Sequence, residues 1–292
     1  MRDDDRPSVL GAGPGQPRRR RLSDAETERR MLETAAEAVG ETGLTVSLDH
    51  LRLEDVIRAA GVARSAVYRR WPSKGEFLGD LLLELAGGEA PLAATGVAEV
   101  GATIRGILAA SLDELADGAA RVRAVAEIVR VTAEDDFRLV STSREWRTYL
   151  ALTVTFVGME AGELRDRIGE ALSGSEARFV ERIAANHAAV LGLLGLRRAA
   201  GPDGVVLAHL SNALVRGMVV KVLAQPELAG VRVRADLGGD DADWSLVAYG
   251  VARLLLGDLE PDPAVVWDEA RGARLRAAIE AGADLPELVE AV

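Results

Sequence analysis

The chain has 292 residues, no cysteine and a formal net charge of −11, and aromatic residues make up only 4% of it. The lack of cysteine excludes a disulfide framework and a thiolate zinc site, and it fits a reducing cytoplasm. Alanine and leucine favour helices, whereas chains poor in aromatic residues rarely build β-sandwiches. The composition therefore predicts an all-α protein.

No segment resembles a signal peptide or a membrane span. The first residues mix acidic residues, glycine and proline with the run Arg18–Arg21, and no apolar region follows them. The longest apolar stretch, residues 205–223, is interrupted by polar residues such as Asn212 and Arg216, whereas a membrane helix needs about 20 apolar residues. We expect a soluble cytoplasmic protein that has no membrane partner.

The net charge is unevenly divided along the chain. Residues 1–75 carry 14 Lys and Arg against 12 Asp and Glu, a net charge of +2, and the rest of the chain carries −13. Between Arg58 and Lys74 there are five basic residues and no acidic one. A local basic face on an acidic body is compatible with contacts to the phosphates of a nucleic acid.

Residues 1–22 are expected to form a disordered basic arm. Such an arm either enters a minor groove or remains a solvated tail that adds only non-specific attraction. The first helix is expected to start at Ser23, which forms a capping box with Glu26, and to stop at Gly43.

Two short helices, over residues 53–60 and 63–71, follow the first. Gly61 joins them, because glycine takes a positive φ without penalty and so permits a steep crossing. A second capping box at Ser73 opens a fourth helix through Leu85. We expect residues 23–88 to form one helix-turn-helix domain.

The two short helices combine a buried side with a polar outer side. The residues expected to share a core are Val56, Ala60, Val62 and Val67. The outward residues of the second helix are Arg64, Ser65, Tyr68 and Arg69. These side chains supply donors for guanine edges and phosphates, together with an aromatic ring that has a polar tip, so this side is predicted to be a DNA-recognition surface.

Residues 24–85 resemble the DNA-binding domain of the TetR family of bacterial transcriptional regulators. The resemblance lies in the Ala-Gly-Val turn at 60–62 and the Tyr-Arg-Arg-Trp-Pro-Ser-Lys run at 68–74. Ala63 stands where many members have a capping serine. The candidate DNA contacts are Arg64, Ser65, Ala66, Tyr68, Arg69 and Arg70, with Lys74 as a phosphate anchor and Thr45 and Ser47 as further phosphate contacts. Trp71 is expected to pack in the core.

Residues 92–292 are predicted to form a larger, entirely helical domain. The expected helices cover residues 97–116, 118–132, 136–161, 174–199, 204–224, 242–257 and 263–281, and no strands are expected. The resemblance implies that this domain dimerises and often encloses a small molecule. Candidate residues for a ligand pocket share one face of the 136–161 helix: Trp146, Tyr149, Thr153 and Phe156. Ordinary core packing is the alternative for each.

Two helices are predicted to form a four-helix dimer interface. The stripe on the first consists of Phe179, Ile183, His187, Val190 and Leu194. The stripe on the second consists of Leu207, Leu210, Leu214 and Met218, where Ala213 and Gly217 permit close approach. His187 and His209 lack a carboxylate pattern, so we expect packed or interface side chains and neither a metal site nor a cofactor.

Three functions fit these observations. The first is a repressor that binds a palindromic operator as a homodimer and is released by a small-molecule effector. The second is a DNA-binding dimer without a small-molecule ligand. The third is an enzyme with its site in the C-terminal domain, which the absence of a Gly-rich phosphate loop, a metal-ligand spacing and a nucleophile elbow argues against.

Overall fold

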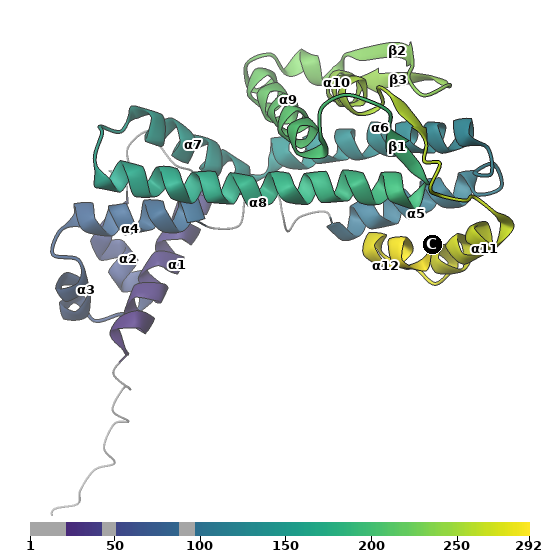
Figure 1. Ribbon diagram of the computed structural model, residues 1–292. Coiled ribbons are helices and arrows are strands. Elements are labelled where there is room, and N and C mark those ends of the chain that lie inside the picture. Colours follow the sequence, from purple (N-terminus) through teal and green to yellow (C-terminus); the bar gives the residue numbers. More distant parts are fainter. Residues whose placement is uncertain (1–21, 43–50, 88–96) are drawn as a thin grey trace, which may run out of the picture.

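The computed structural model describes residues 22–42, 51–87 and 97–292. Most of these residues lie in α-helices, as Figure 1 shows, and the predicted all-α class is confirmed apart from two short β-ribbons. The expected basic arm and the predicted phosphate contacts Thr45 and Ser47 lie outside the described residues, except for Leu22.

Four helices pack together at the N-terminal end. They are α1 (Asp24–Thr42), α2 (Leu53–Ala60), α3 (Arg64–Arg70) and α4 (Lys74–Gly87). The serine caps form as predicted: the Glu26 amide lies 3.1 Å from Ser23 Oγ, and the Glu76 amide lies 3.3 Å from Ser73 Oγ. These bonds satisfy amides that a helix start leaves unpaired. The shared core contains Met31, Leu32, Ala35, Val39, Val56, Val67, Trp71, Phe77 and Leu81.

The long helix α8 (Glu163–Leu193) runs from this N-terminal part into the larger domain (Figure 1). It packs along α4, and α7 (Arg144–Gly158) contacts both α1 and α4. Leu152, Ile168 and Leu172 extend the N-terminal core into these two helices. The four N-terminal helices are therefore held against α7 and α8 by apolar packing.

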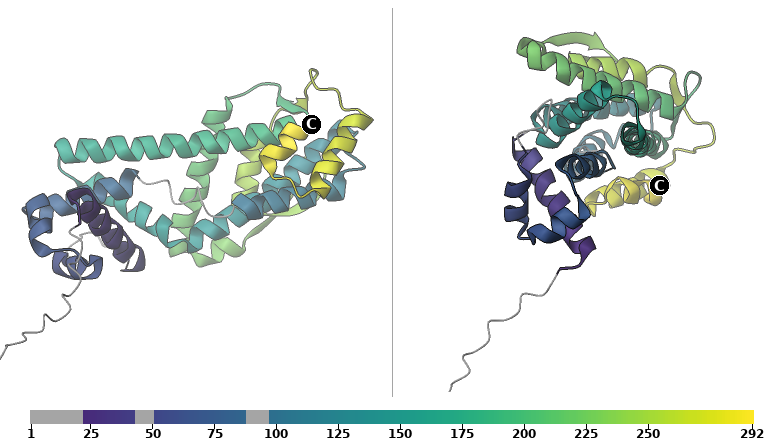
Figure 2. Two further views of the ribbon diagram at one scale, coloured as in Figure 1. Left: turned by 90° about the horizontal axis from the view of Figure 1, so that it is seen from below. Right: turned by 90° about the vertical axis from the view of Figure 1, so that its left-hand side faces the viewer.

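A second core lies in the larger domain. It is enclosed by α5 (Val97–Ser111), α6 (Gly118–Thr142), the C-terminal end of α8, α9 (Gly204–Ala224) and α10 (Leu246–Leu255), and it includes Leu108, Leu193, Leu207, Trp244 and Val251. The terminal helices α11 (Glu269–Glu280) and α12 (Leu285–Ala291) cover α5 and the end of α8, as the view from below shows (Figure 2).

Two antiparallel ribbons were not expected. Strand β1 (Leu196–Arg198) pairs with β4 (Leu259–Pro261), and β2 (Arg232–Asp236) pairs with β3 (Asp241–Ser245) in the register Val233 to Trp244. The predicted helix at 242–257 is therefore wrong at its start, because β3 ends at Ser245 and that residue caps α10. Gly238, in the loop between β2 and β3, has a φ of +99°, and a Cβ there would lie 2.6 Å from Ala126.

Other helix boundaries also differ from those predicted. The segment expected as helices 118–132 and 136–161 forms α6 through Thr142 and then α7, because Ser143 leaves the helix and accepts a hydrogen bond from the Trp146 amide at 3.0 Å. Helix α5 ends at Ser111, and α8 ends before the predicted 199 because β1 begins at Leu196. The predicted 263–281 helix begins only at Glu269, capped by Asp268, and the 3₁₀ segment η2 (Pro226–Gly230) and α12 were not expected.

Helix α9 is long and apolar enough by composition to cross a membrane. In this fold it pairs with α8, contacts α10 and α6, and buries Leu207, Ala208, Val215 and Val219. It is thus a packing helix of the larger domain.

Candidate nucleic-acid interface

The turn between α2 and α3 depends on glycine. Gly61 has a φ of +65°, and its amide donates to the Arg58 carbonyl at 3.3 Å, while the Val62 amide donates to the Ile57 carbonyl at 3.4 Å. Ala63 is extended and offers no side-chain cap to α3, and Ser65 does not replace it. Val67 is fully buried, so α3 is held by packing rather than by capping.

The outer face of α3 is solvent-exposed where the sequence predicts DNA contacts. Arg64, Ser65, Tyr68 and Arg69 are exposed, and Ala66 is half-buried between them. The Arg64 guanidinium lies 5.4 Å from the centre of the Tyr68 ring, so these two side chains cover the start of α3 together.

Acidic residues of α1 and α2 contact this outer face. Glu54 Oε1 lies 2.9 Å from Arg64 Nη2 and accepts a hydrogen bond from the Tyr68 hydroxyl at 2.8 Å. Arg69 pairs with Asp24. Sequence analysis did not predict these partners, because they join different helices and no local pattern links them. The pairs are exposed and therefore weak, so a phosphate or a base edge can replace the carboxylates at small cost.

Arg70, another predicted DNA contact, bonds to side chains of two other helices. Its guanidinium makes two hydrogen bonds of 3.0 Å to Glu28 of α1 and one of 2.9 Å to Asp80 of α4, and it lies over the Trp71 ring. This geometry joins three helices and gives Arg70 a stabilising role in the domain, while its contact with DNA stays a prediction. The sequence could not predict these two partners of Arg70, because both carboxylates come from other helices.

Trp71 lies in the core, as expected. Its ring is fully buried and meets Phe77 edge to face, with ring centres 5.1 Å apart. The indole N–H donates to Asp80 at 2.9 Å. Lys74, the predicted phosphate anchor, is half-buried and is the first residue of α4.

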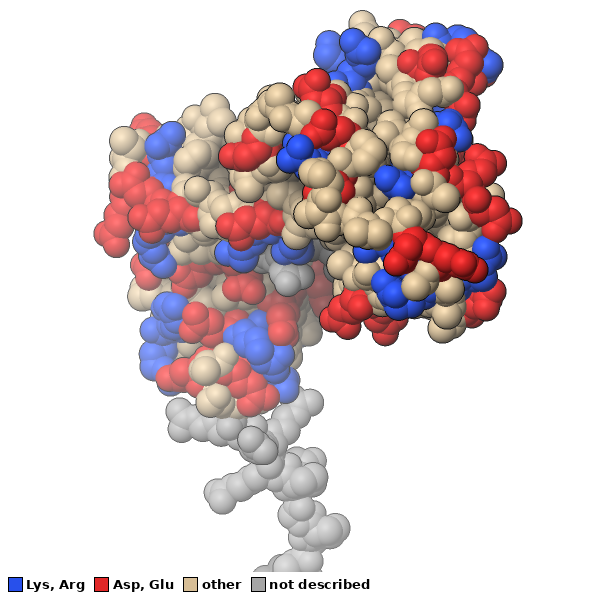
Figure 3. All heavy atoms as spheres, turned by 45° about the vertical axis from the view of Figure 1, so that its right-hand side comes forward, with Lys and Arg blue, Asp and Glu red and all other residues tan. Residues whose placement is uncertain are grey.

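Residues 22–42 and 51–87 carry 8 Lys and Arg against 11 Asp and Glu, so the excess of basic residues in the first 75 residues is not part of the described surface. Figure 3 shows basic and acidic side chains interspersed on the small N-terminal domain, and acidic clusters among basic and uncharged side chains on the larger domain.

The structure does not bring the four predicted pocket residues into one cavity. Trp146 is buried with Val140 and Val219, and its indole N–H has no partner. Tyr149 and Phe156 pack against the core of the N-terminal domain, and the Thr153 hydroxyl donates to the Tyr149 carbonyl at 2.9 Å. The four residues share one face of the predicted helix, but this face contacts different parts of the molecule along its length. Residues on one helix face therefore need not line one pocket.

A polar network connects Tyr149 to two other helices. Arg216 Nη1 of α9 lies 2.7 Å from Glu176 Oε2 of α8, and Asn212 donates to the other carboxylate oxygen at 2.8 Å. The Tyr149 hydroxyl of α7 donates to Glu176 at 3.3 Å, and its ring lies under the Arg216 guanidinium. The network therefore ties α9 to the two helices that support the N-terminal domain.

Most of the predicted dimer stripe is turned inward. Phe179, Val190, Leu194 and Leu207 are buried, Leu214 and Met218 pack against the core of the larger domain, and Ile183 and His187 are half-buried. Only Leu210 of the nine residues is exposed. Helix α9 is apolar on two sides, and periodicity alone could not show which side the protomer itself buries.

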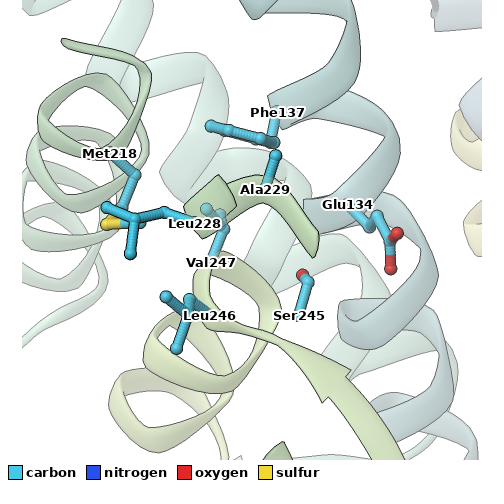
Figure 4. Close-up of a pocket in the computed structure, with 8 residues that line it drawn as sticks. All are labelled: Glu134, Phe137, Met218, Leu228, Ala229, Ser245, Leu246 and Val247. Carbon is cyan, nitrogen blue, oxygen red and sulfur yellow. The ribbon is translucent and has the colours of Figure 1, made fainter. Parts of the chain in front are cut away.

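Two cavities in the described part of the larger domain differ in size. One lies among α6, α9, η2 and the start of α10 (Figure 4) and encloses about 20 Å³, room for about one water. The other lies between α8 and α9 and encloses about 200 Å³. None of the four predicted pocket residues lines either cavity. Among the described residues, no cluster of three or more His, Asp or Glu is arranged to hold a metal ion.

Comparison with known proteins gives one match. Residues 32–81 match the model of the bacterial regulatory proteins of the tetR family. This segment contains the α2–α3 turn, the outer face of α3 and the buried Trp71. The curated proteins and the solved structures gave no match to the chain.

Proposed function

We propose that this DNA-binding transcriptional regulator of the TetR family binds a palindromic operator as a homodimer and is released from it by a small molecule. The family is the one that the sequence resemblance predicted. The exposed outer face of α3 carries the proposal, because Arg64, Tyr68 and Arg69 present donors that can reach guanine edges and phosphates in a major groove. A regulator of this kind acts in the cytoplasm.

Dimerisation is supported by an exposed apolar face on α9, distinct from the inward stripe. Its members are Val206, Leu210, Ala213, Gly217 and Val220, which recur at helical spacing. Val206 and Leu210, on adjacent turns, are 43% and 46% exposed, and Val220 nearly three turns further on is 46% exposed, which is unusual for large apolar side chains on one helix face. The small residues in the middle let a second helix approach closely. A two-fold dimer would place two α3 helices in successive major grooves, about 34–36 Å apart.

Replacing Leu210 by glutamate should break the dimer. A carboxylate placed at a two-fold interface meets its own copy, and we expect at least about 2 kcal/mol of lost association, or roughly a 30-fold rise in the dimer dissociation constant. Light scattering over a concentration series measures the change. Val266→Glu is the matched control, because Val266 is 75% exposed and lies outside α9. Equal dimer dissociation constants for the two variants would contradict the α9 interface.

Release by a small molecule is supported by the coupling of the larger domain to the DNA-binding domain. Helix α8 packs on α4 at one end and on α9 at the other, and the Glu176–Arg216 pair joins α8 to α9. A ligand that favours one arrangement of these helices shifts the separation of the two α3 helices and so lowers the affinity for DNA. A DNA-binding dimer with no small molecule is the alternative, and it would show the same operator affinity in every metabolite tested.

Selection of bound sequences from a random DNA pool tests the proposal. We expect the full-length protein to enrich a palindrome whose half-sites are about one helical turn apart, with an affinity that falls steeply as salt rises. Enrichment of a single, non-repeated site would contradict the dimer. Enrichment of no sequence at either low or moderate salt would contradict sequence-specific binding.

A further inference from the structure

The cleft between α8 and α9 differs from the other cavity in the chemistry of its walls. Four apolar side chains line it, Ala184, Ala188, Leu191 and Leu207. Two polar side chains, His187 and Arg198, face the same space, and Gly204 at the start of α9 completes the wall. At about 200 Å³ the cleft is larger than the roughly 150 Å³ that suffices for benzene in an apolar cavity.

Arg198 brings a positive charge without an ion-pair partner among the described residues. Its Nη2 donates to the Leu255 carbonyl at 2.8 Å and its Nη1 to the Gly257 carbonyl at 3.4 Å, so neutral oxygens hold the guanidinium. Burial lowers the pKa of Arg198, and the charge of Asp258 opposes this effect. A half-buried cation held only by neutral oxygens gains free energy from an anion that replaces lost water.

His187 lies in the same cleft with an unused ring nitrogen. Its Nδ1 is buried and has no hydrogen-bond partner. Burial, reinforced by the charge of Arg198, lowers the pKa of His187 to about 4, so the ring is neutral at pH 7. An organic cation would be repelled by Arg198, whereas a carboxylate can pair with Arg198 and accept a hydrogen bond from the imidazole.

We propose that this cleft binds a small organic carboxylate, with the carboxylate group at Arg198 and His187 and a short chain or single ring between the apolar side chains. Asp203 caps α9 by accepting a hydrogen bond from the Val206 amide at 2.8 Å. This bond engages the carboxylate of Asp203 at the start of α9, and neither Asp203 nor Asp258 lines the cleft.

The position of the cleft makes the carboxylate an effector, a role that rests on the proposed function. The cleft separates α8, which packs on α4, from α9, which carries the proposed dimer face. A ligand wedged between α8 and α9 changes their separation, and with it the relation between the dimer face and the two DNA-binding domains.

Histidine NMR of the full-length protein tests binding without DNA. The chain has only three histidines, and loss of one signal in His187→Gln assigns the resonance. With benzoate or butanoate up to 20 mM we expect a saturable shift of this signal and a rise of the His187 pKa by at least about one unit, because the bound anion offsets the charge of Arg198. Benzamide should bind at least about tenfold more weakly, since it lacks the charge-assisted bond.

Ala184→Leu fills the cleft without removing either polar group and should abolish the shift. Ala177→Leu, on an exposed side of α8, should retain it. No shift with either carboxylate, an equal response to benzamide, or a shift that persists in Ala184→Leu would overturn the site.

In a parallel operator-binding assay, benzoate should weaken DNA binding at least tenfold in the wild type and leave Ala184→Leu unaffected. If benzoate binds saturably by NMR but DNA affinity does not change, the effector role alone is overturned. If no sample binds DNA, the proposed function is overturned, and the NMR titration still tests the cleft.

Discussion

Replacing Arg69 by alanine is expected to weaken operator binding about 10- to 100-fold for each half-site. A recognition-helix arginine contributes about 1–3 kcal/mol to binding, and each 1.4 kcal/mol is a factor of ten. The ion pair between Arg69 and Asp24 does not reduce this value much, because both side chains are more than half exposed and such pairs are weak. Titration of the enriched operator by fluorescence anisotropy measures the loss. The folded protein should keep its thermal stability.

The neighbouring Arg70 provides the matched comparison, because it has the same charge and is one residue away. Arg70→Ala breaks the bonds to Glu28 and Asp80, so we expect lower thermal stability and a smaller loss of affinity measured below the melting transition. Arg253→Ala, on an exposed position of α10, controls for the change in net charge. A loss of affinity in Arg70→Ala as large as that in Arg69→Ala would contradict the different roles that we propose for the two side chains.

Salt dependence then separates two kinds of contact by Arg69. If the guanidinium reads a base edge, Arg69→Ala relaxes the consensus at one position and leaves the salt dependence unchanged. If it binds a phosphate, affinity falls equally for all sequences, and the slope of log affinity against log salt decreases by about one for each protomer.

The helix-turn-helix domain could be predicted from sequence because its determinants are local. Gly61 needs a positive φ at the turn, Ser23 and Ser73 bond to amides three residues ahead, and Val67 follows from helical spacing within a single turn. Each of these interactions spans few residues. The family match over residues 32–81 covers the same segment.

The hairpin of β2 and β3 had a local signal that the helical interpretation overlooked. Residues 232–236 alternate charged and apolar side chains, and Gly238 and Gly239 supply a turn before a second alternating run. Residues 246–255 favour a helix, and the predicted helix was wrongly started before them, at residue 242. The register Val233 to Trp244 buries the indole under the ribbon, where its N–H donates to the Ala235 carbonyl at 3.1 Å.

The proposed dimer face and the cleft could not be predicted, because both depend on which side of α9 the protomer covers. Leu207 and Leu214 fall on an apolar stripe as good as that of Val206 and Leu210. Contact with α8 and α10 buries the first stripe and leaves the second exposed. Arg198 enters the cleft from β1, a strand that sequence analysis did not expect.

The largest loss of stability is expected from Trp71→Ala. The indole is fully buried, meets Phe77 edge to face and donates to Asp80, and its backbone amide ends α3 by bonding to the Val67 carbonyl at 2.8 Å. Removal of a buried tryptophan side chain costs about 3–5 kcal/mol, because it combines lost burial with a cavity. Urea unfolding followed by circular dichroism measures this cost, and operator binding should be lost where the N-terminal domain melts.

Two milder variants separate the contributions of the indole. Trp71→Phe keeps an aromatic ring against Phe77 but removes the bond to Asp80, and we expect a loss of about 1.5–3 kcal/mol, the range for a bond to a charged group. Asp80→Asn retains a neutral acceptor for the indole, and it weakens both that bond and the partly exposed pair with Arg70, so its effect should be about 1 kcal/mol. If Trp71→Ala unfolds at the wild-type urea concentration yet fails to bind the operator, the ring contributes to DNA contact, and the assignment of Trp71 to the core is wrong. We therefore expect the loss of stability to be largest for Trp71→Ala, smaller for Trp71→Phe and smallest for Asp80→Asn. This order follows if the buried ring holds the end of α3, because α3 has seven residues and no side-chain cap of its own.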